Sequence, residues 1–99
     1  MSAVQRNEVF IYETKEQRLS LECFRHYYFI HQEVYRWTPS ARRDTARILD
    51  ILSGLHHLSV FVAPENKQLI RYSALFGFTY SHTLTSPLDG EDYLILERH

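Results

Sequence analysis

The stretch LSVFVAPENKQLIRYSALFGF, residues 58–78, decides the fold of this chain. It starts with a short apolar run that Pro64 ends, and such a run is typical of a central strand buried on both faces. Residues 65–76 follow with apolar side chains at helical spacing, and Gly77 marks the expected end of that helix. The stretch therefore predicts a buried strand followed by a helix.

A second, longer helix is predicted upstream by SARRDTARILDILSGL, residues 40–55. Its apolar side chains gather in one stripe over residues 48–55, and its charged side chains lie mostly elsewhere. Thr38 or Ser40 can cap its start, and Gly54 lies at its expected end.

The remaining apolar segments are short, rich in β-branched and aromatic residues, and predict strands. They span residues 9–13, 19–24, 29–37, 78–84 and 93–97. The link between the second and third has no strong turn signal, so a single long bent strand is an alternative there. A strand, a helix of about four turns and a buried strand form a crossover unit. We therefore expect the strands at residues 29–37 and 58–62 to be parallel neighbours. The order β-β-β-α-β-α-β-β predicts an α/β chain with a mixed, α+β-type sheet and helices packed on it.

Composition limits the classes of protein that this chain can belong to. Ninety-nine residues predict one domain, and 11 basic against 12 acidic residues argue against a general nucleic-acid binder. Cys23 is the only cysteine; it cannot form an internal disulfide, and we expect it to be buried on a strand. No apolar run reaches the roughly 20 residues of a membrane span, and the start lacks a signal-peptide core. We expect no membrane association and a cytoplasmic protein.

Residues 63–80, APENKQLIRYSALFGFTY, resemble the second conserved block of the GCN5-related N-acetyltransferase (GNAT) superfamily. The match is carried by Asn66, by the Gly77-Phe78 pair and by the order of elements over about residues 9–97. The resemblance implies a truncated GNAT-like fold, in which residues 1–99 form a single domain without the usual N-terminal strand and helices. An uncovered first strand would then need an identical subunit or another protein to cover it.

The resemblance also implies which residues bind acetyl-CoA. The loop before the long helix occupies the place of the family's pyrophosphate loop, although it contains no glycine. The implied cofactor-binding residues are Arg42, Arg43, Asp44, Thr45 and Asn66. The two arginines could instead be solvated or contact a partner, and the asparagine could simply cap the second helix.

Two residues are expected in catalysis on the same grounds. Glu33 lies in the third strand, where the family often has its general base. Its alternative is a surface carboxylate paired with Arg36 or with a neighbouring strand. Tyr72 would protonate the leaving thiolate, but the family position falls on Ser73, so packing among aromatic residues is the alternative. The six histidines have no metal-ligand spacing, and we expect no metal.

The leading expectation is an acetyl-CoA-dependent N-acetyltransferase with a degraded CoA loop, which transfers an acyl group to an amine. The alternative is a non-catalytic GNAT-fold structural or protein-binding module, for example a bacteriophage virion component. The glycine-free loop and the displaced tyrosine favour that alternative. A third reading is a regulatory protein that binds CoA or a nucleotide without turnover.

Overall fold

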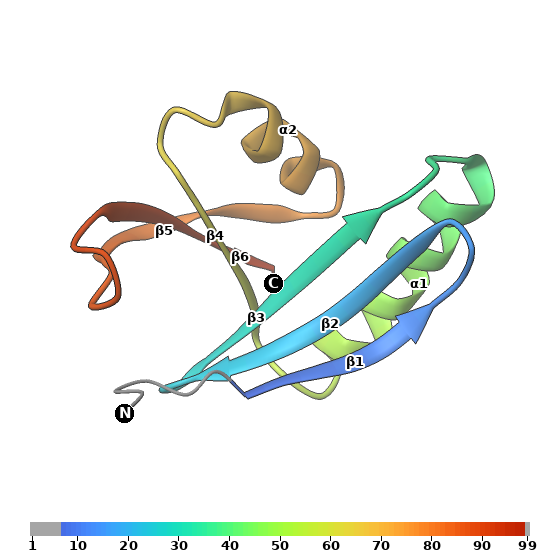
Figure 1. Ribbon diagram of the computed structural model, residues 1–99, viewed down its shortest axis with the longest axis horizontal. Helices are drawn as coiled ribbons and strands as arrows, with labels where there is room; N and C mark the ends of the chain where they lie inside the picture. The colour runs from blue at the N-terminus through green and yellow to red at the C-terminus, as the bar shows by residue number, and fades with distance from the viewer. Residues whose placement is uncertain (1–6, 99) are drawn as a thin grey trace.

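In the computed structural model, which describes residues 7–98, two helices accompany one six-stranded sheet. The elements are β1 (Asn7–Glu13), β2 (Gln17–Phe24), β3 (Tyr27–Val34), α1 (Pro39–Ser53), β4 (Leu58–Val62), α2 (Lys67–Leu75), β5 (Phe78–Thr85) and β6 (Asp92–Arg98) (Figure 1). The mixed α+β sheet and the predicted order of strands and helices are confirmed. Neither α1 nor α2, the helices of this described part, combines the length and hydrophobicity that a bilayer span needs.

The strands are arranged in the order β1-β2-β3-β4-β6-β5. The neighbours β3 and β4 are parallel, as the crossover through α1 predicts, and all other neighbours are antiparallel. The parallel pair is very short, because only Tyr28 with Leu58 and Phe29 with Ser59 are in register. Beyond these residues the two strands diverge, and α2 lies over the opening between them (Figure 1).

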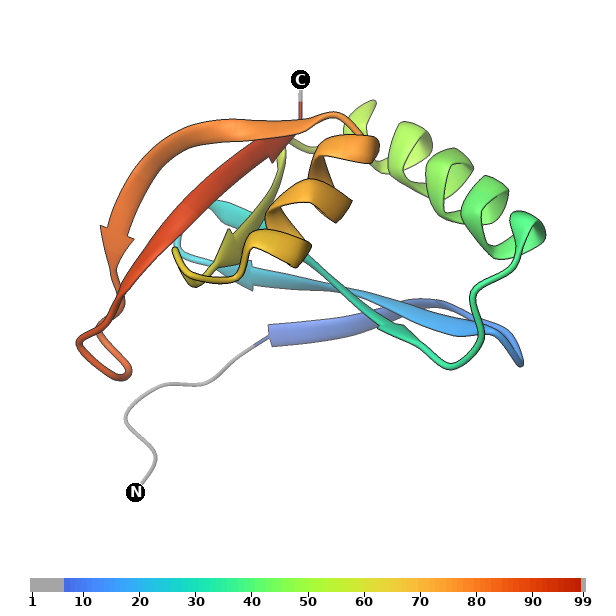
Figure 2. The ribbon, with the colours of Figure 1, turned by 90° about the horizontal axis from the view of Figure 1, so that it is seen from above.

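Both helices lie on the same side of strands β1–β3, which we call the helix face (Figure 2). Leu49 of α1 and Phe76 after α2 pack there with Leu58 and Val62 of β4 in the main core. The opposite side, which we call the open face, holds a smaller cluster around Tyr27, Phe29 and Ile95. Neither helix contributes a residue to this second cluster.

The hairpin between β2 and β3 is tighter than the sequence predicts. Its turn consists of Arg25 and His26, with Arg25 in the left-handed region at φ 56°, so β3 already begins at Tyr27. The strand also stops earlier, at Val34, because the next two backbone N–H groups both donate to the carbonyl of Glu16. The single bent strand that was the alternative does not form.

One prediction about the core is wrong. Cys23 is exposed, although it alternates with Leu19 and Leu21 as a core residue would. It lies near the end of β2, opposite Asn7 and Tyr28 in the strand pairing. The two-residue period fixes the face of a side chain, but not how far along the strand the helix layer extends.

Candidate functional site

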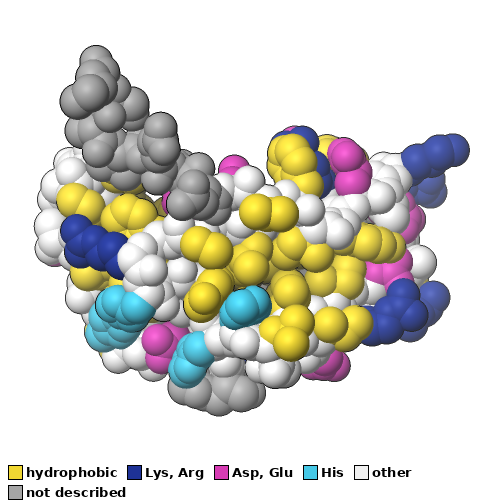
Figure 3. All heavy atoms as spheres, turned by 90° about the horizontal axis from the view of Figure 1, so that it is seen from below, with side chains coloured by type: hydrophobic (Ala, Val, Ile, Leu, Met, Phe, Trp, Pro, Cys, Tyr) yellow, Lys and Arg dark blue, Asp and Glu magenta, His cyan; other side chains and the backbone are white. Residues whose placement is uncertain are grey.

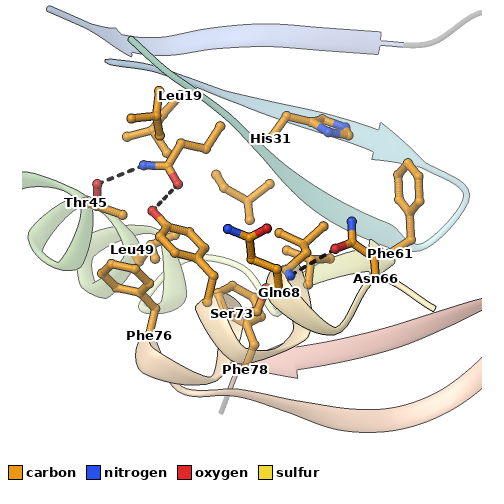
Figure 4. Close-up of a pocket in the computed structure, with 16 residues that line it drawn as sticks. Leu19, His31, Thr45, Leu49, Phe61, Asn66, Gln68, Ser73, Phe76 and Phe78 are labelled. Carbon is orange, nitrogen blue, oxygen red and sulfur yellow. Dashed lines mark hydrogen bonds between the residues drawn. The ribbon is translucent and has the colours of Figure 1, made fainter. Parts of the chain in front are cut away.

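A cleft of about 480 Å³ opens on the helix face where β3 and β4 diverge (Figure 4). Its walls come from β2, β3, α1, β4, α2 and the start of β5. Polar side chains line one part of it and apolar side chains the other. The polar ones include Gln32, Thr45, Asn66, Gln68 and Tyr72.

The cleft follows from the way the strands separate. Ile30 to Val34 of β3 and Val60 to Val62 of β4 lie beyond the last paired residues, so their facing edges share no ladder. Backbone N–H and C=O groups are obligatory hydrogen-bonding groups, and those at these edges remain available to water or a ligand. An extended ligand with its own amide groups could therefore pair with either edge, as an added strand does.

A hydrogen-bonded network of neutral side chains forms the polar wall. The amide of the fully buried Gln17 donates to the carbonyl of Ala41 at 2.9 Å. The Gln32 amide donates to Gln17 Oε1 at 2.6 Å and to Thr45 Oγ1 at 3.1 Å. The Thr45 hydroxyl lies 2.8 Å from both Gln17 Oε1 and the Ala41 carbonyl, and can donate to one of them at a time.

Tyr72 connects α2 to this network, because its hydroxyl donates to Gln32 Oε1 at 2.6 Å. Burial raises the pKa of the Tyr72 phenol above its ordinary value. The ring also packs against Trp37 and Phe76, at centroid distances of 5.6 and 5.3 Å. The phenol is therefore fixed in direction and kept protonated at the wall of the cleft.

The two residues expected in catalysis lie on opposite faces of the sheet. Successive residues of a strand point to opposite sides. Since Gln32 faces the cleft, Glu33 lies on the open face. Its carboxylate accepts a hydrogen bond from Arg18 on β2 at 2.9 Å, and both side chains are well exposed. The structure thus matches the alternative of a surface pair with a neighbouring strand, and the partner is not Arg36.

The start of α1, where the family resemblance puts the pyrophosphate, lies beside the acidic side chain of Glu16, which comes from the turn between β1 and β2. Thr38 is the N-cap and accepts from the N–H of Ala41 at 3.0 Å, which settles the choice between Thr38 and Ser40. The Thr38 hydroxyl in turn donates to Glu16 Oε2 at 2.7 Å. A carboxylate is stabilised at the positive end of a helix, and it opposes an anionic ligand there.

The five residues expected to bind the cofactor are not gathered in one place. Thr45 and Asn66 line the cleft, and Asn66 also caps α2 by accepting from the N–H of Leu69 at 3.1 Å. Arg42 and Arg43 are exposed on the first turns of α1 and do not line the cleft.

Asp44 also lies outside the cleft lining, because its carboxylate is engaged elsewhere. It accepts a hydrogen bond from the Tyr12 hydroxyl at 2.9 Å and lies 3.4 Å from the Arg47 guanidinium. The carboxylate thereby ties α1 to β1.

Gln17 and Gln32 are the site residues that sequence reasoning missed. The available signal was an amide at an apolar position, because Gln32 stands between Ile30 and Val34 on the helix face of β3. A polar residue that shares a face with core residues needs a buried partner.

Within residues 7–98, no group of three or more His, Cys, Asp or Glu side chains could hold a metal ion. No family model, curated protein or solved structure matches this chain.

Proposed function

We propose that the chain binds an acyl-CoA in the cleft and transfers the acyl group to an amine. The observation that carries the proposal is the early divergence of β3 and β4, which leaves two backbone edges facing a cleft of about 480 Å³. The pantetheine arm of a CoA is an extended chain with two amide groups. Such an arm can pair with a free strand edge by the same hydrogen bonds as a peptide strand.

In the proposed reaction the amine nitrogen attacks the thioester carbonyl directly. A C–N bond forms, the C–S bond breaks, and the thiolate takes a proton. Tyr72 is the proposed donor, because its phenol lines the cleft and its raised pKa keeps it protonated. The amine loses its proton to water, because Glu33 lies on the other face of the sheet and pairs with Arg18, and proximity supplies most of the rate.

The CoA phosphates contribute little in this proposal. Glu16 lies at the start of α1, so the pyrophosphate meets a carboxylate instead of free N–H groups. Arg42 and Arg43 are exposed next to that point and can offer charge only through flexible side chains. We therefore expect acetyl-pantetheine to bind almost as tightly as acetyl-CoA.

The second candidate is a non-catalytic structural or protein-binding module, a role that a virion component could fill. It is favoured by the pairing of Glu33 with Arg18 and by the exposed edge strand. Val9 and Phe10 of β1 are 62% and 65% exposed, and Ile51 and Leu55 are exposed on and just after α1. Hydrophobic side chains gather on the lower side of the molecule, where β1 and α1 lie (Figure 3). A second copy or another protein would cover this region.

Thermal unfolding with and without acetyl-CoA tests the proposal. At about 1 mM ligand and a Kd of about 10 μM, binding stabilises the native state by about 2.7 kcal/mol. For a chain of this length that raises Tm by about 10 °C or more. The CoA thiol that is released when the acyl group passes to an amine is then followed with a thiol reagent. The Cys23→Ser variant is used for this assay, because Cys23 is exposed and would react.

The outcomes separate the two candidates. A Tm increase with amine-dependent thiol release supports the transferase. A Tm increase without release supports a CoA-binding module that does not turn over. An unchanged Tm contradicts acyl-CoA binding, and assembly seen by sedimentation then favours the structural module.

A further inference from the structure

A second pocket, of about 220 Å³, lies on the open face beside the turn of the β5–β6 hairpin. Aromatic and aliphatic side chains from five strands and the hairpin turn line it. The aromatic ones are Phe24, Phe29, Phe61 and Tyr93. Ligand pockets for drug-sized molecules measure roughly 300–1,000 Å³, so this one has room only for a small group.

Three of the rings meet nearly at right angles. The Phe61 ring lies 5.0 Å from that of Phe29 at 79°, and 5.6 Å from that of Tyr93 at 84°. The three rings therefore pack edge to face and form one continuous aromatic wall beside the pocket. A cation within about 6 Å of a ring centroid is attracted by the negative face of the ring, and several such faces around one site form an aromatic cage.

The charged groups of this pocket are acidic. Glu22 and Asp89 border it, and no Lys, Arg or His is among the described residues that line it. Glu22 is buried, with 4% of the residue exposed, and its carboxylate lies 2.6 Å from His31 Nε2. Asp89 accepts hydrogen bonds from the Tyr93 hydroxyl at 2.6 Å and from the N–H of Glu91 at 2.8 Å.

The hydrogen bond from Tyr93, followed by that from Glu91, lowers the pKa of Asp89. The carboxylate at the rim is therefore ionised at neutral pH. Aromatic faces and carboxylates attract the same kind of ligand, because both offer negative potential to a cation with an apolar surface.

We propose that this pocket binds the head group of a small alkylammonium cation, such as a methylated ammonium. The rings contact the methyl or methylene groups, and Asp89 supplies the opposite charge. The proposal does not depend on acyl-CoA binding, because its argument uses the lining of the open-face pocket alone.

Choline and its neutral isostere 3,3-dimethylbutan-1-ol form a matched pair of probes, since they differ in charge and hardly in shape. Binding is measured by titration of backbone amide signals at neutral pH, where Asp89 is ionised. We expect choline to shift amides of the hairpin and of β4, and to bind at least about 10-fold more tightly than the isostere. Equal binding of the two, or shifts confined to the cleft on the helix face, overturns the proposal.

Variants at Tyr93 separate the ring from its hydroxyl. Tyr93→Leu removes one ring of the wall and should weaken choline binding about 5-fold or more, whereas Tyr93→Phe keeps the ring and should stay within about 2-fold. Phe24→Leu is the second wall variant if Tyr93→Leu unfolds. Phe10→Leu is the control, because that ring is exposed on β1 outside the pocket. Wild-type choline affinity in a folded wall variant contradicts the proposal.

Discussion

The two faces of β3 differ in the kind of partner that their polar side chains have. On the helix face, Gln32 joins a network of neutral groups that reaches from the fully buried Gln17 to Tyr72. On the open face, Glu33 pairs with Arg18, and His31 lies 2.6 Å from the carboxylate of Glu22. Neutral groups can be buried at small cost when they are hydrogen-bonded, whereas a buried ion pays a much larger desolvation penalty. The cleft is thus suited to hold and orient an uncharged arm, and the open face to attract a cation.

Removal of the centre of the neutral network should give the largest effect. Gln17→Leu takes away the acceptor of Gln32 and a donor to Ala41. Each buried group that loses its partner costs about 1–3 kcal/mol, so we expect the free energy of unfolding to fall by about 2–4 kcal/mol. Urea unfolding measures this loss.

The matched control is Glu33→Gln on the open face, which removes one exposed ion pair with Arg18. Exposed pairs contribute about 0–1 kcal/mol, so this variant should stay close to the wild type. Similar losses of unfolding free energy in the two variants would show that removal of a polar partner costs the same on both faces.

A smaller effect is expected at the other end of the network. Tyr72→Phe removes the hydrogen bond to Gln32 and keeps the ring packing against Trp37 and Phe76. We expect a loss of about 1 kcal/mol in the free energy of unfolding. If the phenol also protonates a thiolate, kcat for acyl transfer should fall about 10²-fold or more while KM changes little. An unchanged kcat in an active preparation would remove Tyr72 from catalysis and leave it a structural role.

The order of elements could be predicted because it depends on local signals. The apolar run before Pro64, the stripe of α1 and the glycine at Gly77, with φ 88°, each act within a few residues. The parallel pairing of β3 and β4 could be predicted from the length of the crossover between them. The early divergence of β3 and β4 left no such signal, since it depends on how the two halves of the sheet pack in three dimensions.

The candidate site was less predictable for the same reason. Gln17 and Tyr72 are 55 positions apart, and only the fold brings them to one network through Gln32. The resemblance pointed to Tyr72, but a helical offset of one residue left its direction open until its partner was known. The carboxylate of Glu16 at the start of α1 depends on the tight turn between β1 and β2, which the sequence did not specify.

The smallest effect concerns the acidic rim of the open face and appears as a pH dependence. The pKa of Asp89 is lowered, first by the hydrogen bond from Tyr93. A carboxyl group with a lowered folded-state pKa stabilises the native state above its unfolded pKa, and this stabilisation is lost as pH falls through the folded value. The free-energy difference between the wild type and Tyr93→Phe should therefore be present at neutral pH and shrink below about pH 4.

The same bond raises the pKa of Tyr93, so the stabilisation that the bond provides should also fade as pH rises through that raised value. Urea unfolding of both proteins across this range measures the difference, and a constant difference from neutral pH to about pH 3 would contradict the role given to the Tyr93–Asp89 bond.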